Sequence, residues 1–120
     1  MSAALRKITI TITAGIAFLA ISSRPAQAGQ DAAAVAKGKT VYTAQKCSMC
    51  HAIEGKGGKA SALDGVGTKL TADQIKEWIV TPKAATTKAK STKKPPMPDK
   101  YSKLPAADID ALVAYMQSLK

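Results

Sequence analysis

The five residues Cys47-Ser48-Met49-Cys50-His51 carry the most information in this 120-residue chain. The two thiols stand three positions apart, about one helical turn, and a histidine follows the second thiol directly. C-x-x-C-H is the order of residues to which c-type haem is attached. Each thiol can add across one vinyl group of the porphyrin to form a thioether, and the imidazole can bind the iron. The segment therefore predicts covalent haem, with Cys47 and Cys50 as attachment points and His51 as the proximal iron ligand.

Three other interpretations of this segment compete with haem attachment. A redox-active C-x-x-C motif sits at a strand-to-helix turn, but here a helical pattern precedes Cys47 and no strand is predicted. A structural disulfide between Cys47 and Cys50 is compatible with an exported protein. So short a motif can also arise by chance. A four-ligand zinc site is excluded, because the chain has two Cys and one His in all.

The start of the chain has the layout of a secretory signal peptide. Two basic residues precede an uncharged segment at residues 8–21, and small residues end at Ala28. The uncharged segment is shorter than the ~20 residues that a membrane helix needs. We therefore expect a signal peptide at residues 1–28, cleaved after Ala28, and one domain at residues 29–120. An uncleaved membrane anchor is the alternative.

Composition limits what this domain can be. The chain is too short for a Rossmann unit with a substrate domain or for a barrel enzyme. Aromatic residues make up only 4% of the chain, and a domain of this size buries only about 60–65% of its unfolded surface. We infer that something other than protein side chains fills the core. The net charge is +10, but no nucleic-acid-binding motif occurs.

Hydrophobic periodicity predicts helices and no convincing strand. Helices are expected at residues 31–46, with Asp31 as the cap, at residues 71–80, and from Pro105 through the last apolar stripe. The glycine-rich segment 55–67 and the proline-containing segment 83–98 are expected to be loops. Loops this long are unusual unless they wrap something.

Two local patterns refine these helices. Thr71 and Gln74 have the spacing of a capping box. Gly38 lies on the apolar face of the first helix beside Val41 and Tyr42. A glycine there weakens the helix by ~1 kcal/mol, so we expect another helix to approach closely at this point. A tolerated surface glycine is the alternative.

A haem iron bound on both sides needs a second axial ligand, and the chain has no second histidine. Beyond the predicted signal peptide, the methionines are Met49, Met97 and Met116. Met49 lies between the two thiols and is held on the His51 side. Met116 fits the apolar stripe of the last helix, where a methionine is usually core. Met97 has a proline on each side, which limits the entropy lost in holding its sulfur, so we expect Met97 to be the distal ligand.

The chain resembles the class I c-type cytochromes of the small, monohaem bacterial kind. The likeness extends beyond Cys47–His51 to a series of short motifs in the same order: GKTVY (38–42), GVG (65–67), WIVTP (78–82), PPMP (95–98) and LVAYM (112–116). It implies an all-α, small cytochrome c fold of about three to four helices, with long loops around one covalently bound haem c. It also implies that the first and last helices cross near Gly38, Tyr42 and Tyr115. The predicted signal peptide indicates export, so we expect the protein in the periplasm.

The sequence departs from the family pattern at two places. Tyr42 and Cys47 stand one step further apart than in many relatives, and a bulged turn would accommodate the extra residue. Many relatives carry proline near the position of Ser61, where a carbonyl accepts the N–H of the proximal histidine. A backbone carbonyl is available there whatever the side chain, so we expect some acceptor for His51.

Ligation by His51 and Met97 would leave no open iron site for oxygen or substrate. We therefore expect a periplasmic electron carrier rather than an enzyme, with no small-molecule substrate and a positive potential raised by the soft thioether. It would pass single electrons from a quinol-linked complex to a terminal oxidase or reductase. We expect a monomer that docks on acidic redox partners, membrane complexes included, through a lysine loop: Lys83, Lys88, Lys90, Lys93 and Lys94.

Other functions fit the same residues. The chain could be the haem subunit or an anchored module of a larger oxidase or dehydrogenase complex. If Met97 does not bind iron, a haem peroxidase or a ligand sensor becomes possible, since both need a vacant iron position.

Overall fold

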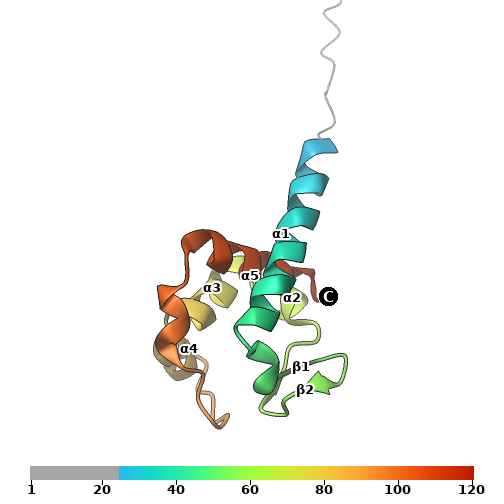
Figure 1. Cartoon of the computed structure of the whole chain (residues 1–120). Coiled ribbons are helices and arrows are strands. Elements are labelled where there is room, and N and C mark those ends of the chain that lie inside the picture. The colour runs from blue at the N-terminus through green and yellow to red at the C-terminus, as the bar shows by residue number, and fades with distance from the viewer. Residues whose placement is uncertain (1–24) are drawn as a thin grey trace, which may run out of the picture.

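The computed structural model describes residues 25–120. Five α-helices dominate them: α1 (Pro25–Ala44), α2 (Val66–Lys69), α3 (Ala72–Val80), α4 (Pro82–Lys88) and α5 (Ala106–Ser118). Two 3-10 helices, η1 (Cys47–Met49) and η2 (Asp99–Lys103), and three short strands, β1 (His51–Ile53), β2 (Lys56–Gly57) and β3 (Ser61–Ala62), complete the fold (Figure 1). The mostly helical architecture confirms the predicted fold class. The predicted signal peptide lies almost wholly outside the described residues, and its cleavage stays a prediction.

The first helix differs from its predicted bounds. α1 begins at Pro25, before Asp31, so Asp31 is an interior residue of the helix and not its cap. α1 ends at Ala44, where the prediction placed the end at Lys46. Residues 25–30 (PAQAGQ) contain two alanines, which have the highest helix propensity, and Pro25 suits the first helical position.

Two short helices were missed, which explains why about three to four were expected. α4 occupies the first part of the predicted loop 83–98, and Pro82 is its first residue. Proline suits that position because the first helical N–H has no intrahelical partner. Thr81 is therefore both the C-cap of α3 and the N-cap of α4. The loop that was expected to follow Pro82 begins only after α4. α2 has only four residues, too few for a periodic pattern.

The prediction of no strand was also wrong. A small sheet in the order β2-β1-β3 pairs β1 antiparallel to β2 and parallel to β3. His51 lies opposite Ser61 in the parallel pair. Each pair of strands is matched at only two residue positions. Strands this short give no alternating pattern of apolar and polar residues in the sequence.

The predicted starts of the other helices are confirmed. The Thr71 side chain accepts from the Gln74 N–H at 3.3 Å, and the Gln74 side chain accepts from the Thr71 N–H at 2.9 Å, which completes the capping box of α3. Pro105 immediately precedes α5. These reciprocal bonds satisfy two donors that a helix start otherwise leaves free.

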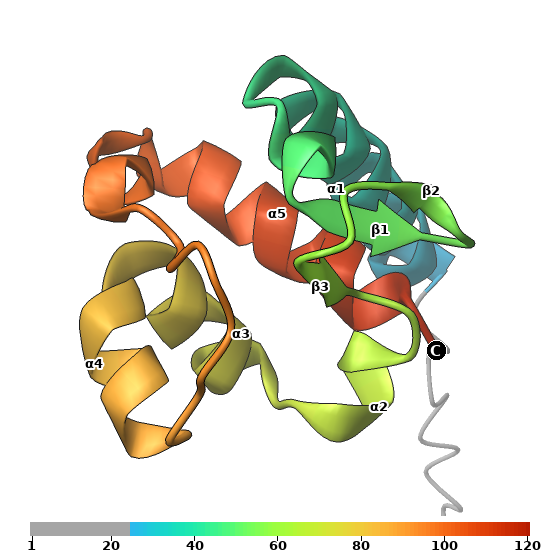
Figure 2. The same ribbon diagram turned by 90° about the horizontal axis from the view of Figure 1, so that it is seen from below.

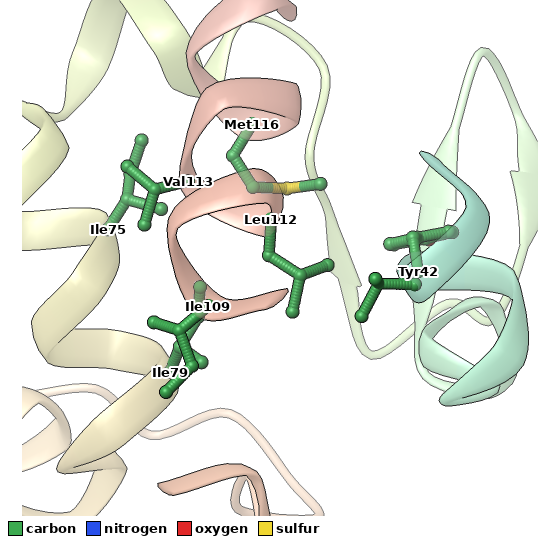
Figure 3. Close-up of a cluster of buried hydrophobic side chains, with 8 residues drawn as sticks. Tyr42, Ile75, Ile79, Ile109, Leu112, Val113 and Met116 are labelled. Carbon is green, nitrogen blue, oxygen red and sulfur yellow. The ribbon is translucent and has the colours of Figure 1, made fainter. Parts of the chain in front are cut away.

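The core forms where α5 packs against α1 and α3. Figure 3 shows side chains of α5 between Ile75 and Ile79 of α3 and Tyr42 of α1. The buried cluster contains Val41, Tyr42, Ile75, Ile79, Ile109, Leu112, Val113 and Met116. Gly38 is buried where α1 crosses α5, and a Cβ there would collide with the Ala111 carbonyl and the Tyr115 Cβ. The close helix approach expected at Gly38 is therefore confirmed.

Two groups of elements meet at α5. α1, η1 and the strands form one group, α3, α4 and η2 form the other, and α5 contacts both α1 and α3. Figures 1 and 2 show the η1–β1 segment and the connection from α4 to η2 on opposite sides of α5, both below it in Figure 1. This arrangement places the two segments that carry the predicted iron ligands in different groups. Among residues 25–120, no helix is long and apolar enough to cross a membrane.

Candidate functional site

The Cys47–His51 segment follows α1 through a tight turn. Lys46 adopts a left-handed conformation with φ 56°, and its N–H bonds to the Thr43 carbonyl at 3.0 Å. A turn with a left-handed residue thus lies at the place where the sequence suggested a bulged turn. Both cysteines are free thiols, so the alternative of a disulfide finds no support. The Cys47 side chain is half-buried against the core, and burial raises its pKa.

Glycines of the following segment pack against the backbone of this motif. The Gly58 N–H bonds to the Ser48 carbonyl at 2.8 Å. A Cβ at Gly58 would collide with the Met49 carbonyl, and a Cβ at Gly57 would collide with the His51 carbonyl. The glycine-rich composition predicted a loop, but its function here is close approach to the C-x-x-C-H backbone.

His51 is half-buried and oriented by the neighbouring strand. Its ring Nδ1 lies 3.2 Å from the Ser61 carbonyl oxygen, which is the acceptor expected from the sequence. Burial lowers the pKa of His51, and the bond to Ser61 opposes that shift. The imidazole is therefore neutral at neutral pH. A neutral ring that donates from Nδ1 leaves the Nε2 lone pair for a metal, the arrangement typical of ligating histidines.

Tyr42 contributes to the site in a way that the sequence did not reveal. Its hydroxyl donates to the His51 carbonyl at 3.2 Å, and its side chain is buried. Burial raises the pKa of Tyr42 to about 12, with smaller contributions from Cys47 and Tyr115. Helical periodicity identified Tyr42 only as a core residue, because a bond across nine positions depends on the turn that follows α1.

η2 adds a second aromatic residue beside the thiols. Tyr101 packs against the hydrophobic core, and burial followed by the nearby Cys47 and Cys50 raises its pKa. The Lys100 ammonium lies 5.1 Å from the centre of the Tyr101 ring. η2 therefore brings the second group of elements next to Cys47 and Cys50.

Met97 lies in the connection from α4 to η2. Its side chain is half-buried. It is not part of the hydrophobic cluster, and it makes no hydrogen bond with any described residue. Met116 is 7% exposed and part of the core, whereas Met49 is 73% exposed beside the thiols. Partial burial away from the protein core suits a side chain that contacts a non-protein group. Cys47, Cys50 and His51 lie in one continuous segment, whereas Met97 lies in the connection between α4 and η2, on the other side of α5 (Figure 2).

Some lysines of the predicted lysine loop pair with acidic side chains and others do not. Lys83 lies 3.8 Å from Asp99, and Lys88 lies 3.1 Å from Glu77. Lys90, Lys93 and Lys94 are exposed and make no ion pair with a described residue. Three lysines of the predicted loop therefore keep their charges unpaired just before Met97.

Comparison with known proteins identifies the class to which this fold and site belong. The cytochrome c family model matches residues 35–120, so the chain belongs to the cytochrome c family. It is a c-type cytochrome, a haem-binding protein of electron transfer. No curated protein and no solved structure matches the chain.

The residues present fit haem c. Two free thiols sit at the C-x-x-C spacing on a backbone held by glycines, and the next residue is a neutral imidazole with its Nδ1 hydrogen-bonded. No cluster of three or more His, Cys, Asp or Glu side chains that could hold a bare metal ion occurs in residues 25–120. The donor set is thus that of a porphyrin-bound iron.

Proposed function

We propose that this chain is a class I c-type cytochrome that carries single electrons between respiratory proteins in the periplasm. One haem would be attached through Cys47 and Cys50, with His51 and Met97 as axial ligands. The haem supplies one-electron chemistry when bound. The protein residues attach it, orient it and keep other molecules from the iron.

The hydrogen bond from His51 to the Ser61 carbonyl, immediately beyond two free thiols, supports this proposal most strongly. It fixes the orientation of the ring and selects the tautomer with a free Nε2. It also raises the basicity of Nε2 toward a metal ion. An inert core histidine would not need attachment thiols beside it. The combination is therefore best explained by a tethered haem with His51 on its iron.

Met97 would close the other side of the iron. A thioether ligand favours ferrous iron and raises the potential, and full coordination leaves no position for oxygen or peroxide. Outer-sphere electron transfer without a substrate follows from these two ligands. A redox titration of the purified protein should give a midpoint above zero against the hydrogen electrode, and a midpoint well below zero would refute this ligand set.

The unpaired lysines support docking to an acidic redox partner. Lys90, Lys93 and Lys94 lie in the segment that carries Met97, so their positive charge would lie on the Met97 side of the redox centre. Electron transfer to an acidic redox protein should slow steeply as ionic strength rises from about 0.01 to 0.15 M, where the screening length falls from ~30 to ~8 Å. A rate independent of salt would remove the docking proposal.

Charge reversal locates the docking surface. Lys94→Glu should slow the reaction at low salt, whereas Lys39→Glu, at an exposed position on α1, should leave it close to wild type. The two variants have the same net charge, so equal slowing would show that only total charge matters.

Export and assembly are part of the same proposal. We propose that the signal peptide is removed after Ala28 and that the mature domain is a monomer in the periplasm. N-terminal sequencing of the exported protein tests the cleavage, and its size on a calibrated column tests the monomer. Retention of residues 1–28, or co-purification with a membrane complex, would instead favour an anchored subunit.

A further inference from the structure

The Tyr42 hydroxyl connects α1 directly to the proximal ligand residue. It donates to the main-chain carbonyl of His51 at 3.2 Å, across nine positions of sequence. The Tyr42 side chain is 8% exposed, so little water is available to replace this bond. A buried hydroxyl without its acceptor, or a carbonyl without its donor, costs more than an exposed one.

The crossing of α1 and α5 holds the Tyr42 ring in place. The Tyr115 ring meets it edge-on, with centroids 5.7 Å apart and an interplanar angle of 72°. One turn earlier, Gly38 allows the α1 backbone to pack against the Ala111 carbonyl. The position of the hydroxyl is therefore set by the two helices and not by a mobile side chain.

The His51 backbone is confined from the other side as well. Gly57, with φ 120°, lies so close to the His51 carbonyl that no Cβ would fit. The His51 ring is held separately by the Ser61 carbonyl. Besides its pairing with Ser61 in the β1–β3 ladder, the His51 main chain is held by these two contacts, and among the described residues Tyr42 makes the only side-chain hydrogen bond to it.

We propose that Tyr42 is a positioning residue, whose hydroxyl fixes the His51 main chain and so sets the orientation of the imidazole toward the haem iron. This inference rests on the proposed ligation by His51. Tyr42, a residue of the α1–α5 crossing, would thus help to set the properties of the iron centre. Packing at the crossing requires only the ring, whereas the positioning role requires the hydroxyl.

Two matched variants of the holoprotein separate these roles. Tyr42→Phe and Tyr115→Phe each keep the ring pair and remove one hydroxyl, but only that of Tyr42 bonds to His51. The readouts are the g values of the low-temperature electron paramagnetic resonance spectrum of the ferric protein, the midpoint potential, and amide exchange in β1. Tyr42→Phe should shift the g values and the potential and speed β1 exchange about fivefold, as expected for one lost hydrogen bond.

Tyr115→Phe should match wild type in all three readouts. The inference is overturned if Tyr42→Phe keeps wild-type g values and potential, or if both variants shift them equally. A wild-type protein without a haem signal would refute the proposed function and this inference together. A normal wild-type spectrum with an unaltered Tyr42→Phe spectrum would refute the inference alone.

Discussion

Gly57 lies against the carbonyl of His51, at a distance that leaves no room for a side chain between them. The backbone of the glycine-rich segment therefore forms one wall of the ligand-bearing segment. The glycine content of this segment thus matters for the geometry of the site. Adding a single methyl group at Gly57 tests the contact.

Gly57→Ala should destabilise the protein. The new Cβ would collide with the His51 carbonyl, and φ 120° is strained for alanine, so we expect a loss of about 2–4 kcal/mol in the free energy of unfolding. Gly55→Ala is the control, because Gly55 has φ 73° but no atom within 4 Å of the added Cβ. Backbone strain alone should cost about 1 kcal/mol there. Denaturant unfolding of both variants measures the difference in stability. Equal losses in the free energy of unfolding would contradict the close contact between Gly57 and the His51 carbonyl.

Gly38→Ala should also destabilise the fold. In an isolated helix the change is favourable by about 1 kcal/mol, but here the Cβ would collide with the Ala111 carbonyl. We expect a net loss of about 3 kcal/mol in the free energy of unfolding. Lys39→Ala, at the exposed neighbouring position, should change it by less than about 0.5 kcal/mol. A stabilised Gly38→Ala protein would show that α1 and α5 do not cross so closely.

Cys47→Ser and Cys50→Ser should each remove one thioether. The double variant should release all its haem on denaturation, which haem staining of a denaturing gel detects. Cys47→Ser should also destabilise the fold more than Cys50→Ser, because Cys47 is half-buried against the core and Cys50 is exposed. Persistent haem staining of the double variant would exclude attachment at these residues.

Met97→Ala should leave the haem attached, lower the midpoint potential and open the iron to added ligands. The far-red absorption band expected of a Met–Fe(III) bond should disappear. Met49→Ala is the matched control, since its side chain is 73% exposed and proposed to have no bond to iron. Loss of the band in Met49→Ala and its retention in Met97→Ala would reverse the assignment.

The sequence predicted those features that depend on neighbours along the chain. The C-x-x-C-H order, the Thr71–Gln74 capping box and the glycine on the apolar face of α1 each follow a local rule, and the structure contains the last two as expected. The acceptor for His51 was also anticipated, because any residue near Ser61 offers a carbonyl. The ligand roles themselves stay predictions.

Features that depend on distant parts of the chain could not be predicted. The Tyr42–His51 bond arises only after the turn at Lys46 brings β1 back beside α1. The approach of Tyr101 to the cysteines depends on how η2 packs. α2 and the three strands are too short for any periodic signal, and the proline that seemed to end one helix also begins α4.

The central proposal is that this chain holds a haem covalently through Cys47 and Cys50. The most direct test is the visible spectrum of the protein exported from a host competent in haem maturation, recorded before and after dithionite and again after denaturation and acid–acetone extraction. Covalent attachment should give the sharp bands of a reduced c-type haem, and colour that stays with the polypeptide through extraction. A well-folded, colourless protein, or haem that leaves with the solvent, would contradict it.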